Sequence, residues 1–275
     1  MDTAQLVERL VGWIRDRVVT AGCRGVVLGM SGGVDSAVMA VLCKRAFPKS
    51  TLAVMMPCHS ISQDEEHARL VADNFSIPTR LVVLDSVYDA LSELLPDEKK
   101  APKAMHLARS NLKVRLRMIT LYYLANQLQY LVVGSSNRSE LAVGYFTKYG
   151  DGGADIVPMG NMVKSQVRDM AAFLGIPREI IDKPPSAELR PEQKDADSLP
   201  PYELLDPILT AYVEEDKSVE QIMTMGFDRE VVERTARMVD QSEYKRRQAP
   251  PGIKITPRAF GRDRRLPITN RFKGW

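Results

Sequence analysis

Residues 25–36 read Gly-Val-Val-Leu-Gly-Met-Ser-Gly-Gly-Val-Asp-Ser, and this stretch decides the fold. The apolar run at 25–28 is typical of a short buried strand, and residues 37–42, Ala-Val-Met-Ala-Val-Leu, continue as a helix. The glycines therefore lie on a strand-to-helix turn, where backbone N–H groups converge at the positive end of a helix dipole. We expect this turn to bind an anion.

The residues of this turn separate it from two commoner phosphate-binding loops. It lacks the lysine that ends a Walker A loop, and its spacing is not the Gly-x-Gly-x-x-Gly of dinucleotide-binding folds. Asp35 stands among amides that attract phosphate, where its carboxylate is repulsive unless a cation bridges the two, so the motif implies Mg²⁺. The simpler alternative is a glycine-rich turn in which Asp35 or Ser36 caps a helix. The complete Ser-Gly-Gly-x-Asp-Ser motif after an apolar strand favours nucleotide binding.

Apolar periodicity predicts helices and strands in alternation along the chain. Strands are expected at 51–56, 80–84 and 130–134, after the first at 25–28. Helices are expected near the N-terminus and at 62–75, where Ser62 to Glu65 form a capping box, before residue 95, and at 104–129. This order predicts an α/β fold with a doubly wound, mostly parallel sheet flanked by helices. The loops that follow strands one, two and four should then converge at one edge of the sheet.

Composition and charge exclude several classes of protein. The 275 residues suffice for one large domain, and a net charge of +3 is too small to indicate nucleic-acid binding. The three cysteines form no CxxC pair, which is typical of reduced, buried thiols in a cytoplasmic protein. We expect no membrane-spanning segment and no signal peptide. The arginine-rich tail is interpreted as a solvated end that orders in part against the body or a partner subunit.

The glycine-rich turn resembles that of the ATP pyrophosphatase (PP-loop) superfamily, whose members cleave ATP between the α and β phosphates. A second stretch, residues 144–155, reads Gly-Tyr-Phe-Thr-Lys-Tyr-Gly-Asp-Gly-Gly-Ala-Asp. It resembles the NAD synthetases, as do Asn-Leu-Lys-Val-Arg at 111–115, Ser-Ala-Glu-Leu at 186–189 and Lys-Arg-Arg at 245–247. These motifs follow one another over nearly the whole chain.

The resemblance implies an adenine nucleotide alpha hydrolase-like fold and a defined reaction. Members of this family use ATP, with Mg²⁺, to convert deamido-NAD and ammonia into NAD, AMP and pyrophosphate through an adenylated intermediate, the last step of NAD biosynthesis. It implies a single synthetase domain over 1–275, with a core at about 1–182, a lid-like connection at 183–201, and C-terminal helices with a basic tail at 202–275. Ordering of that connection would shield the intermediate from water.

The resemblance also assigns residues to ligands. It assigns Mg²⁺ to Asp35 and Glu140. It assigns ATP to the turn and to residues from later segments: Gly29, Met30, Ser31, Gly32, Gly33, Val34, Asp35, Ser36, Ser135, Lys164 and Ser186. It assigns deamido-NAD to a third group: Arg115, Lys148, Asp155, Tyr244 and Lys245.

Asp35, Lys164 and Asp155 are the expected catalytic residues. Lys164 would neutralise phosphate charge, and Asp155 would accept a proton from ammonium. The chain departs from the family pattern at several places, among them Ser186, where many ammonia-using members have threonine. Ser135-Ser136-Asn137 stands where many ammonia-using members have Thr-Asp-His, and Tyr244 replaces a common histidine.

Ammonia is the expected nitrogen source, because the 24 residues before the first strand are too few for a glutaminase domain. A separate amidase subunit could supply that ammonia, and the resemblance implies a homodimer. Two alternatives stay open. One is another PP-loop enzyme, such as a GMP synthetase or a tRNA-thiolating ligase, and the other is an ATP-binding sensor without turnover.

Overall fold

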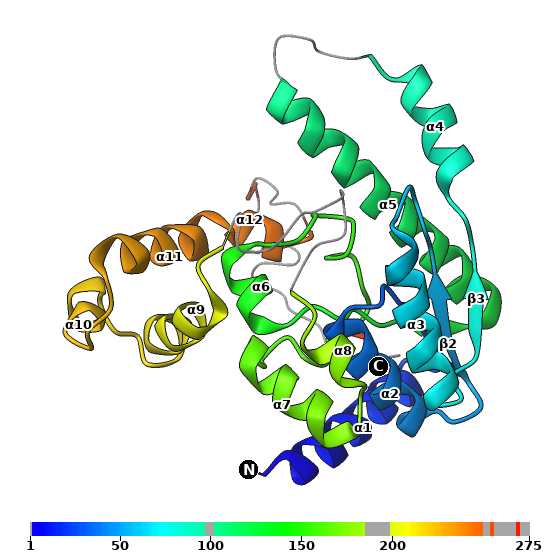
Figure 1. Ribbon diagram of the computed structural model, residues 1–275, viewed down its shortest axis with the longest axis horizontal. Helices are drawn as coiled ribbons and strands as arrows, with labels where there is room; N and C mark the ends of the chain where they lie inside the picture. The colour runs from blue at the N-terminus through cyan, green and yellow to red at the C-terminus, as the bar shows by residue number, and fades with distance from the viewer. Residues whose placement is uncertain (1, 97–101, 185–198, 250–253, 256–267, 270–275) are drawn as a thin grey trace.

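The fold is built on a four-stranded parallel sheet, with the strands in the order β3-β2-β1-β4; β2 and β3 are labelled in Figure 1. The structure is a computed structural model that describes residues 2–96, 102–184, 199–249, 254–255 and 268–269. The strands are β1 (Gly25–Gly29), β2 (Thr51–Met55), β3 (Thr79–Leu81) and β4 (Tyr130–Val132). Val133 continues β4 by bridging to Ile156 in parallel. The predicted parallel α/β sheet is therefore confirmed.

Helices cover both faces of the sheet, and alternate strand residues point to opposite faces. Val26, Leu28 and Met55 belong to a core shared with α1 (Thr3–Thr20), α2 (Val34–Ala46), α3 (Ser62–Asn74), α7 (Lys164–Leu174) and α8 (Arg178–Ile181). Val27 and Val54 point to the other face, toward α4 (Asp85–Leu94) and α5 (Pro102–Leu128). Burial on both faces explains why the strands are continuous apolar runs.

A smaller group of helices packs beside the sheet, on α6 (Arg138–Val143) (Figure 1). It comprises α9 (Tyr202–Leu209), the π-helical turn η2 (Thr210–Glu214), α10 (Val219–Met223), α11 (Arg229–Gln241) and α12 (Glu243–Arg246). Leu205 and Leu209 of α9 are buried against Ala142 and Val143 of α6. The C-terminal helices are therefore anchored on the helix that follows β4.

Several local predictions differ from the structure, and β4 also ends at Val132, short of the predicted 134. The predicted capping box at Ser62 is wrong, because the helix begins at Ser62 with Ile61 as its N-cap and no side-chain cap bond. The third strand ends at Leu81, short of the predicted 84, and all its residues are exposed. Edge strands are commonly this short, since one side has no partner.

The three cysteines are free thiols, and Cys43 and Cys58 are buried. Among the described residues, no helix combines the length and the apolar character needed to cross a membrane. Most of the 183–201 connection, Ser186 and most of the basic tail lie outside the described residues.

Candidate active site

The turn between β1 and α2 presents backbone N–H groups at the carboxyl edge of the sheet. Gly33 is the N-cap of α2 and has no side chain to bond the first N–H groups of the helix. Gly32 has φ +88°, and a Cβ there would lie 2.2 Å from the Asp64 carbonyl oxygen, so only glycine fits. The Ser36 hydroxyl donates to the Gly33 carbonyl at 2.9 Å and holds the turn closed. Such a turn is a ready anion site.

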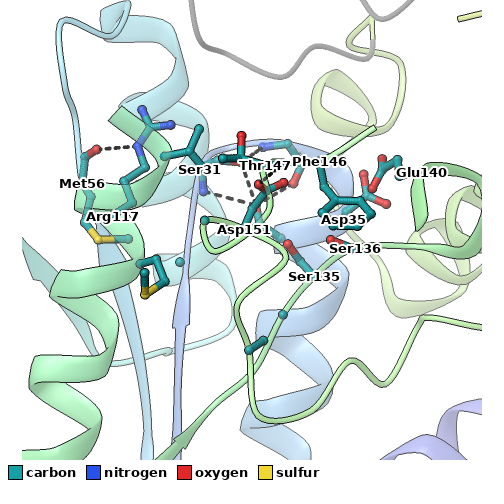
Figure 2. A pocket seen from close by; sticks show the side chains of 18 of the residues that line it. Ser31, Asp35, Met56, Arg117, Ser135, Ser136, Glu140, Phe146, Thr147 and Asp151 are labelled. Atoms are coloured by element: carbon teal, nitrogen blue, oxygen red, sulfur yellow. Dashed lines mark hydrogen bonds between the residues drawn. The ribbon is translucent and has the colours of Figure 1, made fainter. Parts of the chain in front are cut away.

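Lys164 lies between two carboxylates beside this turn. Its ammonium donates to Asp35 Oδ2 and, at 3.2 Å, to Glu140 Oε1. Its side chain is 3% exposed, so the lysine is buried only as part of this trio. The three residues come from α2, α6 and α7, and Figure 2 shows Asp35 and Glu140 side by side. The fold thus brings together three residues that were predicted for ATP and metal.

Asn137 fixes the orientation of both acids. Its side-chain amide donates to Asp35 Oδ1 at 2.8 Å, and its side-chain oxygen accepts the Glu140 N–H at 3.0 Å. Glu140 Oε2 in return accepts the Asn137 N–H, which completes a capping box on α6. The glutamate is therefore held by the first turn of its own helix.

The turn and the trio form one end of a cavity of about 960 Å³. Its volume and its mixed polar and apolar lining suit a nucleotide-sized ligand. Most of the predicted site residues line it: Gly29, Met30, Ser31, Gly33, Val34, Asp35, Ser36, Arg115, Ser135, Glu140, Lys148, Lys164, Tyr244 and Lys245. Two predicted residues, Gly32 and Asp155, do not form part of its wall.

The far end of the cavity carries aromatic rings and cations. Lys148 Nζ lies 5.1 Å from the centre of the Tyr149 ring and 5.6 Å from that of Tyr244. Arg115 donates to the Lys148 carbonyl at 3.3 Å. Lys245 donates to the carbonyls of Gly144 and Phe146, and burial lowers its pKa. Lys245 thus holds the 144–155 loop in place, in addition to lining the cavity.

Asp155 is turned away from the cavity that holds the other predicted residues. Its carboxylate accepts the Tyr122 hydroxyl at 3.1 Å and the Val132 N–H at 2.8 Å. Burial raises the pKa of Tyr122, and the charge of Asp155 adds to that effect. In this position the carboxylate anchors the 144–155 loop to β4 and α5. Its contact with substrate stays a prediction.

Asp151 is a cavity residue that the sequence analysis did not single out. Its Oδ1 accepts the Thr147 N–H at 2.7 Å, and Figure 2 shows the two residues together near the centre of the site. Asp151 lines the cavity, and desolvation by the surrounding protein raises the pKa of its carboxylate, although the Thr147 hydrogen bond acts in the opposite direction. The signal was present, since Asp151 is the acid of the Gly-Asp-Gly-Gly motif.

A second feature that was not predicted is an ion pair next to the glycine-rich turn. Lys183 Nζ donates to Asp64 Oδ1 at 2.6 Å, and both residues line the cavity. Asp64 is the residue whose carbonyl packs on Gly32. Lys183 belongs to the 183–201 connection, which was predicted to form a lid. Its contact with Asp64 beside the turn was therefore not predicted.

The acids beside the turn fit a magnesium ion that also binds phosphate. Among the described residues, no group of three or more His, Cys, Asp or Glu side chains is placed to bind a metal. Mg²⁺ with nucleotides commonly takes only one or two carboxylates, and phosphate and water complete its coordination. Asp35 and Glu140, brought together by Lys164, match that donor set.

Comparison with known proteins identifies the family. The family model described as NAD synthase matches residues 6–249. The NH(3)-dependent NAD(+) synthetase of Carboxydothermus hydrogenoformans is 49% identical over 68% of this chain and 77% of its own. The glutamine-dependent NAD(+) synthetase of Aquifex aeolicus is 41% identical over 94% of this chain and 47% of its own. The chain thus spans about half the length of this glutamine-dependent relative.

A solved structure shares the fold of this chain. The structure of NMN synthetase from Francisella tularensis superimposes with a TM-score of 0.79 at 30% identity. The match covers 92% of this chain and 99% of that one. The family model covers most of the chain, and the chain belongs to the NAD synthase family.

Proposed function

We propose that this chain converts deamido-NAD, ATP and ammonia into NAD, AMP and pyrophosphate. The observation that carries the proposal is the trio of Asp35, Glu140 and Lys164 beside the glycine-rich turn, in the wall of a cavity of about 960 Å³. Membership of the NAD synthase family supports the same reaction. The turn and trio bind the ATP phosphates, and the far end binds deamido-NAD.

The first step joins two anions. An oxygen of the nicotinate carboxylate forms a bond to the α-phosphorus of ATP, while the bond from that phosphorus to the α,β-bridging oxygen breaks and pyrophosphate leaves. Lys164, Lys183 and the N–H groups of the turn lower the repulsion and stabilise the leaving pyrophosphate. Asp35 and Glu140 would hold Mg²⁺, which would supply further positive charge against this repulsion.

The second step requires neutral ammonia. The Asp151 carboxylate accepts a proton from ammonium, and ammonia then attacks the acyl carbon of the adenylate. The bond from that carbon to the AMP oxygen breaks, and the new amide nitrogen loses a proton. A carboxylate with a raised pKa is a better base, so the desolvation of Asp151 suits this role. The family resemblance implies Asp155 in this role, and that assignment stays a prediction; Asp151 is proposed here because it lines the cavity and Asp155 does not.

The substrate is the dinucleotide and not the corresponding mononucleotide. The Francisella relative is named an NMN synthetase, which makes nicotinic acid mononucleotide the competing substrate. The exposed rings of Tyr149 and Tyr244, both within 5.6 Å of the Lys148 ammonium, favour the dinucleotide, because they offer a stacking surface beyond the reacting end.

Free ammonia is the proposed nitrogen source, and a separate amidase subunit can deliver it. Similar proteins include both ammonia-dependent and glutamine-dependent synthetases, so an assay must distinguish the two nitrogen sources. We also propose a homodimer. The long helix α5 exposes Leu107, Ile119 and Tyr123, apolar side chains that a second copy would cover.

A substrate panel tests the proposal. The purified chain is supplied with ATP, Mg²⁺ and ammonium, together with deamido-NAD, nicotinic acid mononucleotide or xanthosine monophosphate, and AMP and pyrophosphate are measured. We expect turnover that depends on deamido-NAD. Preference for the mononucleotide would reassign the substrate, and turnover with xanthosine monophosphate would overturn the reaction. Equal rates with glutamine and ammonium would contradict the proposed nitrogen source.

A further inference from the structure

Helix α9 reaches the phosphate site from the C-terminal group of helices. Asp206 and Tyr202 lie four residues apart on α9, and both contact the segment that carries Lys164. Residues at this spacing share one face of a helix. Both are buried, and Asp206 is 5% exposed. Neither residue lines the cavity, so neither touches a ligand there.

Asp206 caps α7 from a distance. The N-cap of α7 is Val163, whose side chain cannot accept a hydrogen bond, so the first N–H groups of the helix need other partners. The Lys164 N–H donates to Ser139 Oγ at 3.0 Å, and the Ser165 N–H donates to Asp206 Oδ2 at 2.9 Å. Ser139 in turn donates its hydroxyl to Asp206 Oδ1 at 2.5 Å. One carboxylate of α9 therefore holds the first turn of α7 and the first turn of α6.

This cap acts on the residue that matters for phosphate binding. Lys164 is the first residue of α7, so the position of its backbone decides where its ammonium lies between Asp35 and Glu140. The ring of Tyr202 lies 5.3 Å from the same ammonium. A ring face at that distance stabilises a desolvated cation and limits its movement. Asp206 thus holds the backbone at Lys164, and Tyr202 contacts the ammonium at the other end of the side chain.

We infer that Asp206 and Tyr202 are positioning residues for Lys164, so that the C-terminal helices set the geometry of the phosphate site. The inference rests on the proposed phosphate role of Lys164. It does not depend on how deamido-NAD or ammonia binds. It can therefore be tested by the binding of pyrophosphate alone, whichever substrate the enzyme amidates.

The experiment is a double-mutant cycle read by binding. Magnesium pyrophosphate is titrated into the full chain by calorimetry, with Asp206→Asn made in the native background and in Lys164→Met. Loss of a hydrogen bond to a charged group is expected to weaken binding about tenfold in the native background. In Lys164→Met the same change should have an effect of less than about twofold, because the residue through which it acts is gone.

Three further variants keep the test decisive. Glu203→Gln is the matched control, since Glu203 is an exposed acid on the same helix that pairs only loosely with Arg168 at 3.5 Å; it should leave the affinity within about twofold. If Asp206→Asn does not fold, Tyr202→Leu replaces it, with Tyr202→Phe as the variant that keeps the ring. Equal losses in both backgrounds, or no loss in the native one, would overturn the inference while leaving the proposed reaction intact.

Discussion

The two ends of the cavity hold their charged side chains in different ways. At the phosphate end, Lys164 is buried, and each of its partners is held by hydrogen bonds from a helix terminus or a capping side chain. At the far end, Lys148 lies close to the rings of Tyr149 and Tyr244. Tyr244 is 62% exposed. Preorganised charges suit a transition state, because they need no rearrangement as charge develops. Exposed rings suit recognition, because they contribute contact area and do not act on the reacting atoms.

The largest effect is expected from removing the cation at the phosphate end. Lys164→Met should lower kcat by about a thousandfold, because loss of one preorganised donor to developing charge costs that much in other enzymes. The affinity for deamido-NAD should change little, since that substrate binds at the other end. Initial rates and calorimetry measure the two quantities. The exposed Lys49→Met is the control for loss of a lysine. A large loss of dinucleotide affinity would show that the two ends do not act separately.

The next largest effect is expected from replacing Asp151, near the centre of the cavity. Asp151→Asn should lower turnover with ammonium by about a hundredfold, as expected for loss of a general base. Turnover of the native enzyme should rise with pH through the raised pKa of Asp151, and this step should be absent from the variant. Hydroxylamine, a nucleophile that is already neutral, should restore most of the rate. If Asp155→Asn instead removes the pH step and Asp151→Asn keeps it, the base is Asp155.

A subtler change tests how the acids are held. Asn137→Ala should raise the Mg²⁺ concentration for half-maximal pyrophosphate release by about tenfold, a typical cost for losing a residue that orients a metal ligand. It should also lower the free energy of unfolding by about 1 kcal/mol through loss of the α6 cap. Asn137→Ser separates the two effects, because serine caps the helix but cannot donate to Asp35 in the same way. Restored stability with restored Mg²⁺ dependence would refute the orienting role.

The smallest effect is expected at the exposed rings. Tyr244→Leu should raise the KM for deamido-NAD by about fivefold without changing kcat, in line with an exposed cation–π and stacking contact. Tyr244→Phe keeps the ring and should behave like the native enzyme. A fall in kcat with unchanged KM would mean that this end also acts on the reacting atoms.

The phosphate end was largely predictable from sequence, because its main motif is local. A strand, a glycine-rich turn and a helix at 25–46 fix where the N–H groups point, and parallel topology brings the segment after β4 to the same edge. Lys164 and Glu140 came from the family resemblance, and the structure brings them together with Asp35.

Residues whose direction depends on tertiary packing were not predictable. In the 144–155 loop, Asp151 faces the cavity and Asp155 faces β4, and residue spacing alone does not say which acid takes which side. The cap of α7 comes from Asp206, more than forty residues farther along the chain, and Lys183 meets Asp64 across a still longer separation. None of these pairs leaves a periodic pattern in the sequence.

The central claim is that the substrate carboxylate attacks the α-phosphorus of ATP. Deamido-NAD labelled with ¹⁸O at both oxygens of the nicotinate carboxylate tests it directly, with the AMP and NAD products analysed by mass spectrometry. Because one carboxylate oxygen leaves with the adenylyl group, the account predicts one ¹⁸O atom in each AMP and one retained in NAD. Unlabelled AMP, or ADP as the product in its place, would contradict it.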